Sequence, residues 1–192
     1  MNTVTEIITM TTIHCFARWL GFMFLSFFLA LNAWAIDPPL GIGEVRDIPT
    51  KESMSVANAR YQSQAAGMPN GQGVAVGVDR AVSRPGYVKF DGINRSTGTL
   101  YDAKGFGYRI DKNGEWTSSN VSRKMQDKLR AQLNRQLTAA RGANMKVEWR
   151  VPSDSVKKGM ESIAKGRITV TVVPPSQEVI DALRGNDAAN SL

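Results

Sequence analysis

Two periodicities of hydrophobic and polar positions along the chain predict the order of its helices and strands. Apolar residues recur at every third or fourth position in segments that predict helices, and these segments cover about 51–66, 121–141, 153–164 and 177–184. Segments rich in β-branched and aromatic residues predict strands at 74–78, 87–91, 99–104, 146–151 and 167–173. The resulting order predicts an α/β fold of the mixed α+β kind, with a central mixed sheet flanked by helices.

Turn signals predict two hairpins between these elements. Asn94–Gly98 separates the strands predicted at 87–91 and 99–104, so these two strands are expected to pair with each other. A second, shorter hairpin is predicted around Asp111–Gly114, where Asn113 followed by Gly114 favours a type I′ turn.

The N-terminal region predicts an export signal rather than part of the fold. The apolar run 19–31 follows Arg18 and precedes Ala33-Trp34-Ala35, a small-residue cleavage pattern that predicts a signal peptide over 1–35. An uncleaved transmembrane anchor is the alternative, although the run is shorter than the roughly 20 residues of a spanning helix. Cleavage would make the protein secreted or periplasmic. The rest divides into a linker, a folded domain and a disordered tail, predicted at 36–50, 51–184 and 185–192.

The positions of histidine and cysteine exclude several kinds of catalysis. The only histidine is His14 and the only cysteine is Cys15, and both lie in the predicted leader. A chain that has lost this leader has no Ser-His-Asp or Cys-His nucleophilic machinery, no histidine acid–base ribonuclease chemistry and no zinc held by Cys or His. The remaining possibilities are chemistry by carboxylates, lysine and a hard cation, or no catalysis.

Positive charge is concentrated in one part of the chain. The formal net charge is +7, and residues 123–167 alone carry twelve Lys or Arg against four Asp or Glu. A localised basic surface favours a polyanionic partner, either nucleic acid or anionic lipid. The alternative is a solvated helix face without a specific ligand.

Three charged residues at the predicted hairpin could form a metal-dependent site. Asp102 and Lys104 lie two positions apart on one strand and therefore share a face, while Asp91 ends the facing strand. Two converging carboxylates, with the backbone carbonyl of Ala103 between them as a possible third ligand, suit Mg²⁺ or Mn²⁺. Lys104 could then orient or deprotonate the attacking water, or stabilise charge on a phosphate. A cross-strand salt bridge is the alternative role for the same charges.

The residues around this site resemble a known nuclease motif. Phe90-Asp91-Gly92 and the later run Gly98–Gly105 are similar to the core motif of the PD-(D/E)xK nucleases of the restriction-endonuclease superfamily. The wider pattern, over roughly 55–175, resembles one polymorphic-toxin branch, the restriction-endonuclease-fold toxin family, group five. Further segments that carry this resemblance are Ala59–Gln62, Gly107-Tyr108, Asp111–Trp116, Asn134–Gln136 and Val147–Trp149.

The resemblance implies a restriction-endonuclease-like core of order αβββαβ and an exported, metal-dependent nuclease toxin. Such a toxin would hydrolyse DNA in the cytoplasm of a competing bacterium, would be made with a cognate immunity protein and would use no small-molecule cofactor. In this reading Asp91 and Asp102 are metal ligands and Lys104 is the catalytic lysine. The superfamily often has another acidic residue on its first helix, where this chain has Glu52 early and Gln62 and Gln64 nearer the end.

The long basic helix supplies further candidates for the same site. In the superfamily a helical glutamine often lines the site, which implies a catalytic position for Gln136 and a phosphate or base contact for Gln132. Arginines of this helix could hold the DNA backbone, and the candidates are Arg130, Arg135 and Arg141. Ordinary surface glutamines and solvated arginines are the alternatives. At the level of the whole protein, the alternative is a non-catalytic basic periplasmic module that binds nucleic acid or an anionic polymer. A nuclease of the same fold that takes RNA as its substrate is a further alternative.

Overall fold

The structure is a computed structural model that describes residues 39–50 and 54–189. The predicted signal peptide and Glu52 lie outside these described residues. Among the residues that the structure does describe, no helix is both long and apolar enough to span a bilayer.

Three antiparallel strands form the first sheet, in the order β1-β2-β3. These strands are β1 (Val45–Pro49), β2 (Gln72–Gly77) and β3 (Tyr87–Phe90). β2 is the central strand, and five of its six residues are buried.

Four strands form the second sheet, in the order β4-β5-β6-β7. They are β4 (Gly92–Asn94), β5 (Thr99–Ala103), β6 (Lys146–Val151) and β7 (Thr169–Val172). β4 pairs antiparallel with β5, whereas β5, β6 and β7 are parallel, so this sheet is mixed. The mixed α/β fold of the prediction is thus confirmed, and it is consistent with a restriction-endonuclease-like core.

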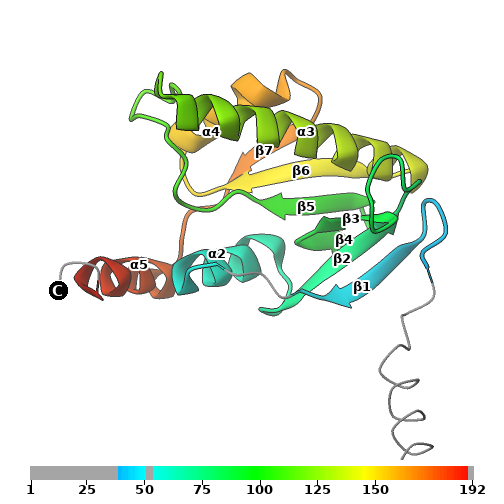
Figure 1. The fold of residues 1–192 in the computed structure, drawn as a ribbon. Helices are drawn as coiled ribbons and strands as arrows, with labels where there is room; N and C mark the ends of the chain where they lie inside the picture. Colours follow the sequence, from blue (N-terminus) through cyan, green and yellow to red (C-terminus); the bar gives the residue numbers. More distant parts are fainter. Residues whose placement is uncertain (1–38, 51–53, 190–192) are drawn as a thin grey trace, which may run out of the picture. The chain divides into compact units, whose positions relative to one another are not determined.

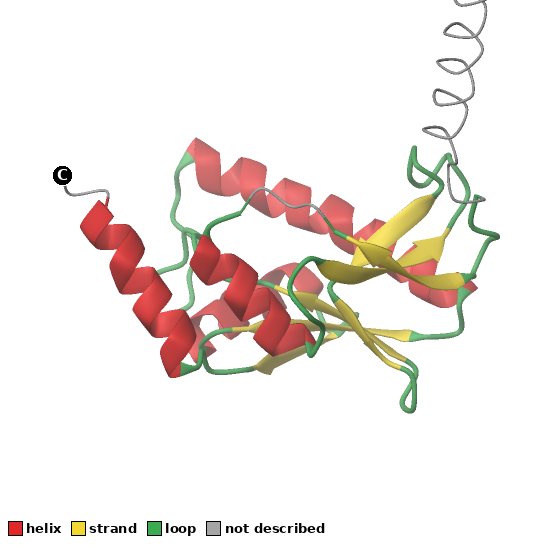
Figure 2. Cartoon of the chain, turned by 90° about the horizontal axis from the view of Figure 1, so that it is seen from below, coloured by secondary structure: helices red, strands yellow, loops and turns green. Residues whose placement is uncertain are grey.

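Helices cover both faces of the mixed sheet (Figure 1). The helices are α2 (Val56–Ala66), α3 (Asn120–Gly142), α4 (Asp154–Ala164) and α5 (Gln177–Ala189). α3 and α4 lie on one face, while α2 lies on the other against β5 and packs beside α5, as Figure 2 also shows. This arrangement places α2 and α3 on opposite sides of β5.

Serine N-caps fix where three of the helices begin. The hydroxyls of Ser55, Ser119 and Ser153 each accept a hydrogen bond from a backbone amide three residues later. The cap of α3 is therefore Ser119, and Asn120 is the first helical residue. Gly67 ends α2 with a φ of 69°, a left-handed conformation that favours glycine.

The main hydrophobic core lies between α3, α4 and the two sheets. Its largest fully buried side chains include Trp149, Phe90, Leu133 and Met160. The predicted apolar stripe of α3 faces this core through Leu129 and Leu133, although its first residue, Val121, is 52% exposed.

Three parts of the chain differ from the sequence prediction. Within the predicted linker, residues 45–49 form the edge strand β1, which pairs with β2. Pro49 is compatible with this strand because it lies at the end of an edge strand, where the missing amide is tolerated. At the other end α5 continues to Ala189, so most of the predicted tail is helical. The turn at Asn113-Gly114 is not type I′, since only Gly114 has a positive φ and type I′ needs two such residues.

The predicted pairing of strand 87–91 also needs correction. β3 pairs with β2 in the first sheet, and it is β4, after Asp91, that forms the hairpin with β5. The predicted single central sheet is therefore two sheets, and the chain passes from one to the other at Asp91. Apolar alternation marks 87–90 as a strand but does not specify its partner.

Candidate active site

Asp91 is the single residue between the two sheets, where β3 ends and β4 begins. Its backbone amide donates to the carbonyl oxygen of Tyr101 at 2.9 Å, which fixes this junction against β5. Asp102 is the next residue of β5. The structure therefore brings the two candidate acidic residues together, although by a different strand pairing from the predicted one.

The carboxylate of Asp91 is positioned by β5 and by α2. Its Oδ2 accepts from the backbone amide of Ala103 at 2.7 Å, and its Oδ1 accepts from Nε2 of Gln62. Gly92 lets α2 come this close, because a Cβ at position 92 would lie 2.5 Å from the carbonyl oxygen of Ala66. A side chain at 92 would push the helix, and Gln62 with it, away from Asp91.

Asp102 is buried, and three side-chain donors converge on one of its oxygens. Its Oδ2 accepts from Nζ of Lys104 at 2.7 Å, from Nε2 of Gln132 at 3.0 Å and from Nε2 of Gln136. The two glutamines come from consecutive turns of α3, which lies over this part of β5. The orientation of this carboxylate is thus fixed by β5 and α3 together.

Lys104 follows β5 and is only 3% exposed. Besides its ion pair with Asp102, its Nζ donates to Oε1 of Gln132 at 2.9 Å and lies 4.9 Å from the ring centroid of Trp149. The sequence left a cross-strand salt bridge open as an alternative, whereas the salt bridge of Lys104 is formed with Asp102, two positions earlier in the chain. Asp91 takes no part in it, so a second carboxylate beside the ion pair has no salt-bridge partner among the described residues.

Gln136 is fully buried and both of its polar atoms are paired. Its Nε2 donates to Asp102 and its Oε1 accepts from Nε1 of Trp149 at 2.8 Å. It is therefore not an ordinary surface glutamine, and it holds Asp102 rather than projecting toward a ligand. Gln132 is partly buried and lies at the edge of the same network.

The proximity of the charges shifts several pKa values. Burial and the nearby charge of Asp102 raise the pKa of Asp91 to about 8. Burial alone would lower the pKa of Lys104, but the neighbouring Asp102, Tyr108 and Asp91 together outweigh burial, so the pKa lies above its usual value. Burial likewise raises the pKa of Tyr108, whose hydroxyl is close enough to respond to all three charged groups. Crowded carboxyls of this kind are common at functional sites.

The site is open at its edge even though the ion pair is buried. Asp91 retains partial exposure, and Gln132 lines a groove of about 690 Å³ between β3 and α3. A ligand in this groove would therefore lie against the residue that hydrogen-bonds both Lys104 and Asp102.

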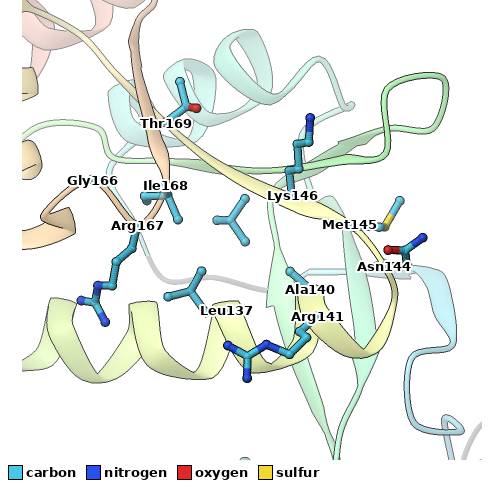
Figure 3. Close-up of a pocket in the computed structure, with 11 residues that line it drawn as sticks. Leu137, Ala140, Arg141, Asn144, Met145, Lys146, Gly166, Arg167, Ile168 and Thr169 are labelled. Atoms are coloured by element: carbon cyan, nitrogen blue, oxygen red, sulfur yellow. The ribbon is translucent and has the colours of Figure 1, made fainter.

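The three candidate arginines of α3 do not act as one group. Arg135 is exposed and lines the groove next to Gln132. Arg130 is held along the helix surface by an ion pair with Asp127 at 2.9 Å. Arg141 lies at the end of the helix in a different pocket of about 530 Å³, lined also by Lys146 and Arg167 (Figure 3). Only Arg135 is thus placed beside the candidate active site.

The donor set fits a hard divalent cation. Two carboxyl groups are close enough to raise a pKa, and a cation between them would relieve that repulsion. The described residues contain no group of three or more His, Cys, Asp or Glu side chains that could hold a metal ion. Side-chain ligands would thus be Asp91 and Asp102 alone, which suits Mg²⁺, an ion that keeps several of its waters. Ala103, the predicted backbone ligand, directly follows Asp102, and its amide donates to Asp91 at 2.7 Å.

Two residues around the site were not assigned there from the sequence. Gln62 was noted only as a non-acidic residue of the first helix, yet it contacts Asp91 directly. Tyr108 packs against the main core and against the ring of Trp116, and it is also close to the charged groups. The only sequence signal for Gln62 was its place in the segment 59–62 that resembles the toxin family.

Comparison with known proteins identifies the family of this chain. No curated protein matches the chain. The sequence model of the family described as restriction endonuclease fold toxin 5 matches residues 58–154, which include every site residue discussed above from Gln62 to Trp149. This match covers half of the chain, and the predicted resemblance is confirmed. The protein therefore belongs to the family of restriction endonuclease fold toxins, group 5.

Proposed function

We propose that this protein is an exported, metal-dependent deoxyribonuclease that acts as an antibacterial toxin. Membership of a restriction endonuclease fold toxin family suggests a nuclease, and the proposal extends this to the substrate and the cofactor. The observation that carries it is the meeting of two carboxyls and a buried ammonium group at the junction of the two sheets.

A divalent cation, Mg²⁺ or Mn²⁺, would be held by Asp91 and Asp102, with the carbonyl of Ala103 as a candidate third ligand. When bound, such a cation supplies Lewis-acid activation and charge neutralisation at the scissile phosphate. Asp91 is held in place by Gln62 and by a backbone amide of β5.

Lys104 is proposed to stabilise the negative charge that develops on the phosphate during hydrolysis. Its ammonium group is kept in place by Asp102, by Gln132 and by the face of Trp149. A fixed, buried donor costs little reorganisation in the transition state, which is the main source of electrostatic catalysis. Gln136 is a positioning residue in this scheme, because it acts through Asp102.

The proposal for DNA as substrate rests on charge. The net charge of +7 and the basic segment 123–167 favour a polyanion, and Arg135 lies beside the site. The exported, antibacterial role rests on the toxin family and on the predicted leader, and it implies a cognate immunity protein and entry into the target-cell cytoplasm. Residue 36 as the N-terminus of exported protein, determined by sequencing, would support cleavage, whereas an intact leader would contradict it.

Plasmid cleavage by the purified full chain tests the enzymatic part. We expect nicking with Mg²⁺ or Mn²⁺ and none with excess EDTA. Asp91→Asn and Lys104→Met should abolish cleavage while circular dichroism shows a folded chain. Asp47→Asn, which removes an exposed carboxylate of β1, is the matched control and should cleave normally. Normal cleavage by both site variants, or cleavage in EDTA, would refute the metal-dependent site.

A further inference from the structure

The groove between β3 and α3 has the charge and the position of a nucleic-acid subsite. Its lining includes three cations from two elements, Lys89 of β3 and Lys128 and Arg135 of α3, together with Gln132. All three cations are exposed, and no carboxylate pairs with any of them among the described residues. Uncompensated cations along a groove attract an anionic backbone.

The cations of α3 form a single stripe along the groove. Lys128, Gln132 and Arg135 are spaced at i, i+4 and i+7, which places them on one face of the helix. Arg130 lies on another face and is engaged by Asp127. One wall of the groove is therefore basic, and its central residue, Gln132, contacts Lys104 and Asp102.

The groove is continuous with the candidate active site at two points. Gln132 lines the groove and also contacts Lys104 and Asp102, at 2.9 Å and 3.0 Å. Lys89 is two positions before Asp91, a separation of about 7 Å along an extended chain. A phosphodiester backbone bound in the groove would therefore lie close to the carboxyl groups of the site, whether it follows β3 or α3.

We propose that this groove binds the DNA backbone next to the scissile phosphate, through Lys89, Lys128 and Arg135. The proposal rests on the proposed nuclease function and adds the path of the substrate strand. Gln132 is the residue at which the bound strand meets the buried ion pair. The second basic pocket, with Arg141, Lys146 and Arg167, lies at the start of β6 and takes no part (Figure 3).

Binding of a short fluorescent DNA oligonucleotide in EDTA tests this path without cleavage. Lys128→Gln, Arg135→Gln and Lys89→Gln should each weaken binding measured by anisotropy. Each should lower the slope of log Kd against log salt by about 0.7–0.9, the value expected for one lost phosphate contact. With Mg²⁺, the same variants should raise KM and leave kcat nearly unchanged.

Lys146→Gln is the matched control, because it removes the same charge at the start of β6. Lys146 pairs with Thr99, three residues along β5 from Asp102, which is about 10 Å of strand. The control should bind and cleave like the unchanged protein. Equal losses in Lys146→Gln and in the groove variants would mean diffuse attraction and would overturn the groove.

The outcomes separate this inference from the proposed function. If cleavage requires Asp91 and Lys104 but does not depend on the groove cations, the proposed DNA-binding role of the groove is refuted and the proposed nuclease function is retained. Oligonucleotide binding that depends on the groove, in a protein that never cleaves, would support the subsite and refute the enzyme. Comparison of single-stranded with duplex oligonucleotides then shows whether the groove takes one strand or a strand within a duplex.

Discussion

Replacing Gln136 by leucine tests whether the buried network behaves as one unit. The change retains a side chain of similar size but removes both of its hydrogen bonds. Nε1 of Trp149 would then be a buried donor without an acceptor, and Asp102 would lose one of its three donors. Nothing near this fully buried position provides a replacement from solvent.

The cost follows from these two losses. An unsatisfied buried donor costs about 1–3 kcal/mol, and a hydrogen bond to a charged group contributes about 1.5–3 kcal/mol. Burial of the added apolar surface of leucine offsets about 1–2 kcal/mol of this. We therefore expect Gln136→Leu to lower the free energy of unfolding by about 2–4 kcal/mol.

Urea unfolding of the metal-free full chain, followed by far-UV circular dichroism, measures this loss. Because m is about 1–3 kcal/mol/M for small proteins, the midpoint should fall by on the order of 1–2 M. Gln126→Leu is the control on the same helix, since Gln126 bonds only the exposed Arg130 and should shift stability by less than about 0.5 kcal/mol.

A double-mutant cycle identifies the physical origin of the loss. Trp149→Phe removes the donor that Gln136→Leu leaves unsatisfied, so the double variant should be more stable than the sum of the single losses predicts, by about 1 kcal/mol or more. A loss below about 1 kcal/mol for Gln136→Leu, or simple additivity in the cycle, would refute the reasoning.

Three further predictions concern the acidic site. The pKa of Asp91 is raised to about 8 in the folded protein, so folding favours the protonated carboxyl over the ionised one. The stabilisation from this carboxyl is therefore fully present below about pH 4 and is lost as the pH rises towards 8. In EDTA, Asp91→Asn should therefore gain thermal stability relative to the unchanged protein between pH 5 and pH 8, and equal pH profiles would contradict this. At pH 8, Mg²⁺ should raise the Tm of the unchanged protein but not that of an Asp91→Asn, Asp102→Asn double variant; calorimetric titration of both gives the binding directly. Gly92→Ala should lower the free energy of unfolding by about 1–3 kcal/mol, because its Cβ would collide with Ala66 on α2. The same change at the open position Gly98, which unlike Gly92 has a positive φ, measures the cost of backbone strain without a collision.

Local patterns predicted much of the fold because they act over a few residues. β6 has the predicted bounds, and α4 begins within one residue of the predicted start at 153 and ends at the predicted residue 164. The two-residue spacing of Asp102 and Lys104 placed both side chains on one face, and the structure joins them in an ion pair. These features depend on periodicity and helix capping, and both can be read from the residues of one short segment.

Features that depend on distant partners were not predictable in the same way. β1 lies among prolines and glycines and becomes a strand only because β2 is beside it. The break at Asp91 arises because the residues before it pair with β2 and the residues after it pair with β5. The alternation of apolar residues does not specify which strand a segment pairs with. The contact of Gln62 with Asp91 requires α2 to pack over β4 at Gly92, a contact between elements far apart in sequence.

The position of Asp91 at the seam between two sheets makes the acidic site a late product of folding. One sheet alone cannot arrange the pair, because the backbone on the N-terminal side of Asp91 belongs to β3 and the backbone on its C-terminal side to β4. The glutamines that orient the two carboxyls come from α2 and α3, on opposite faces of the mixed sheet. A nascent or partly unfolded chain therefore has the acidic residues without their arrangement, and any nuclease activity would begin only when the last of these layers has docked.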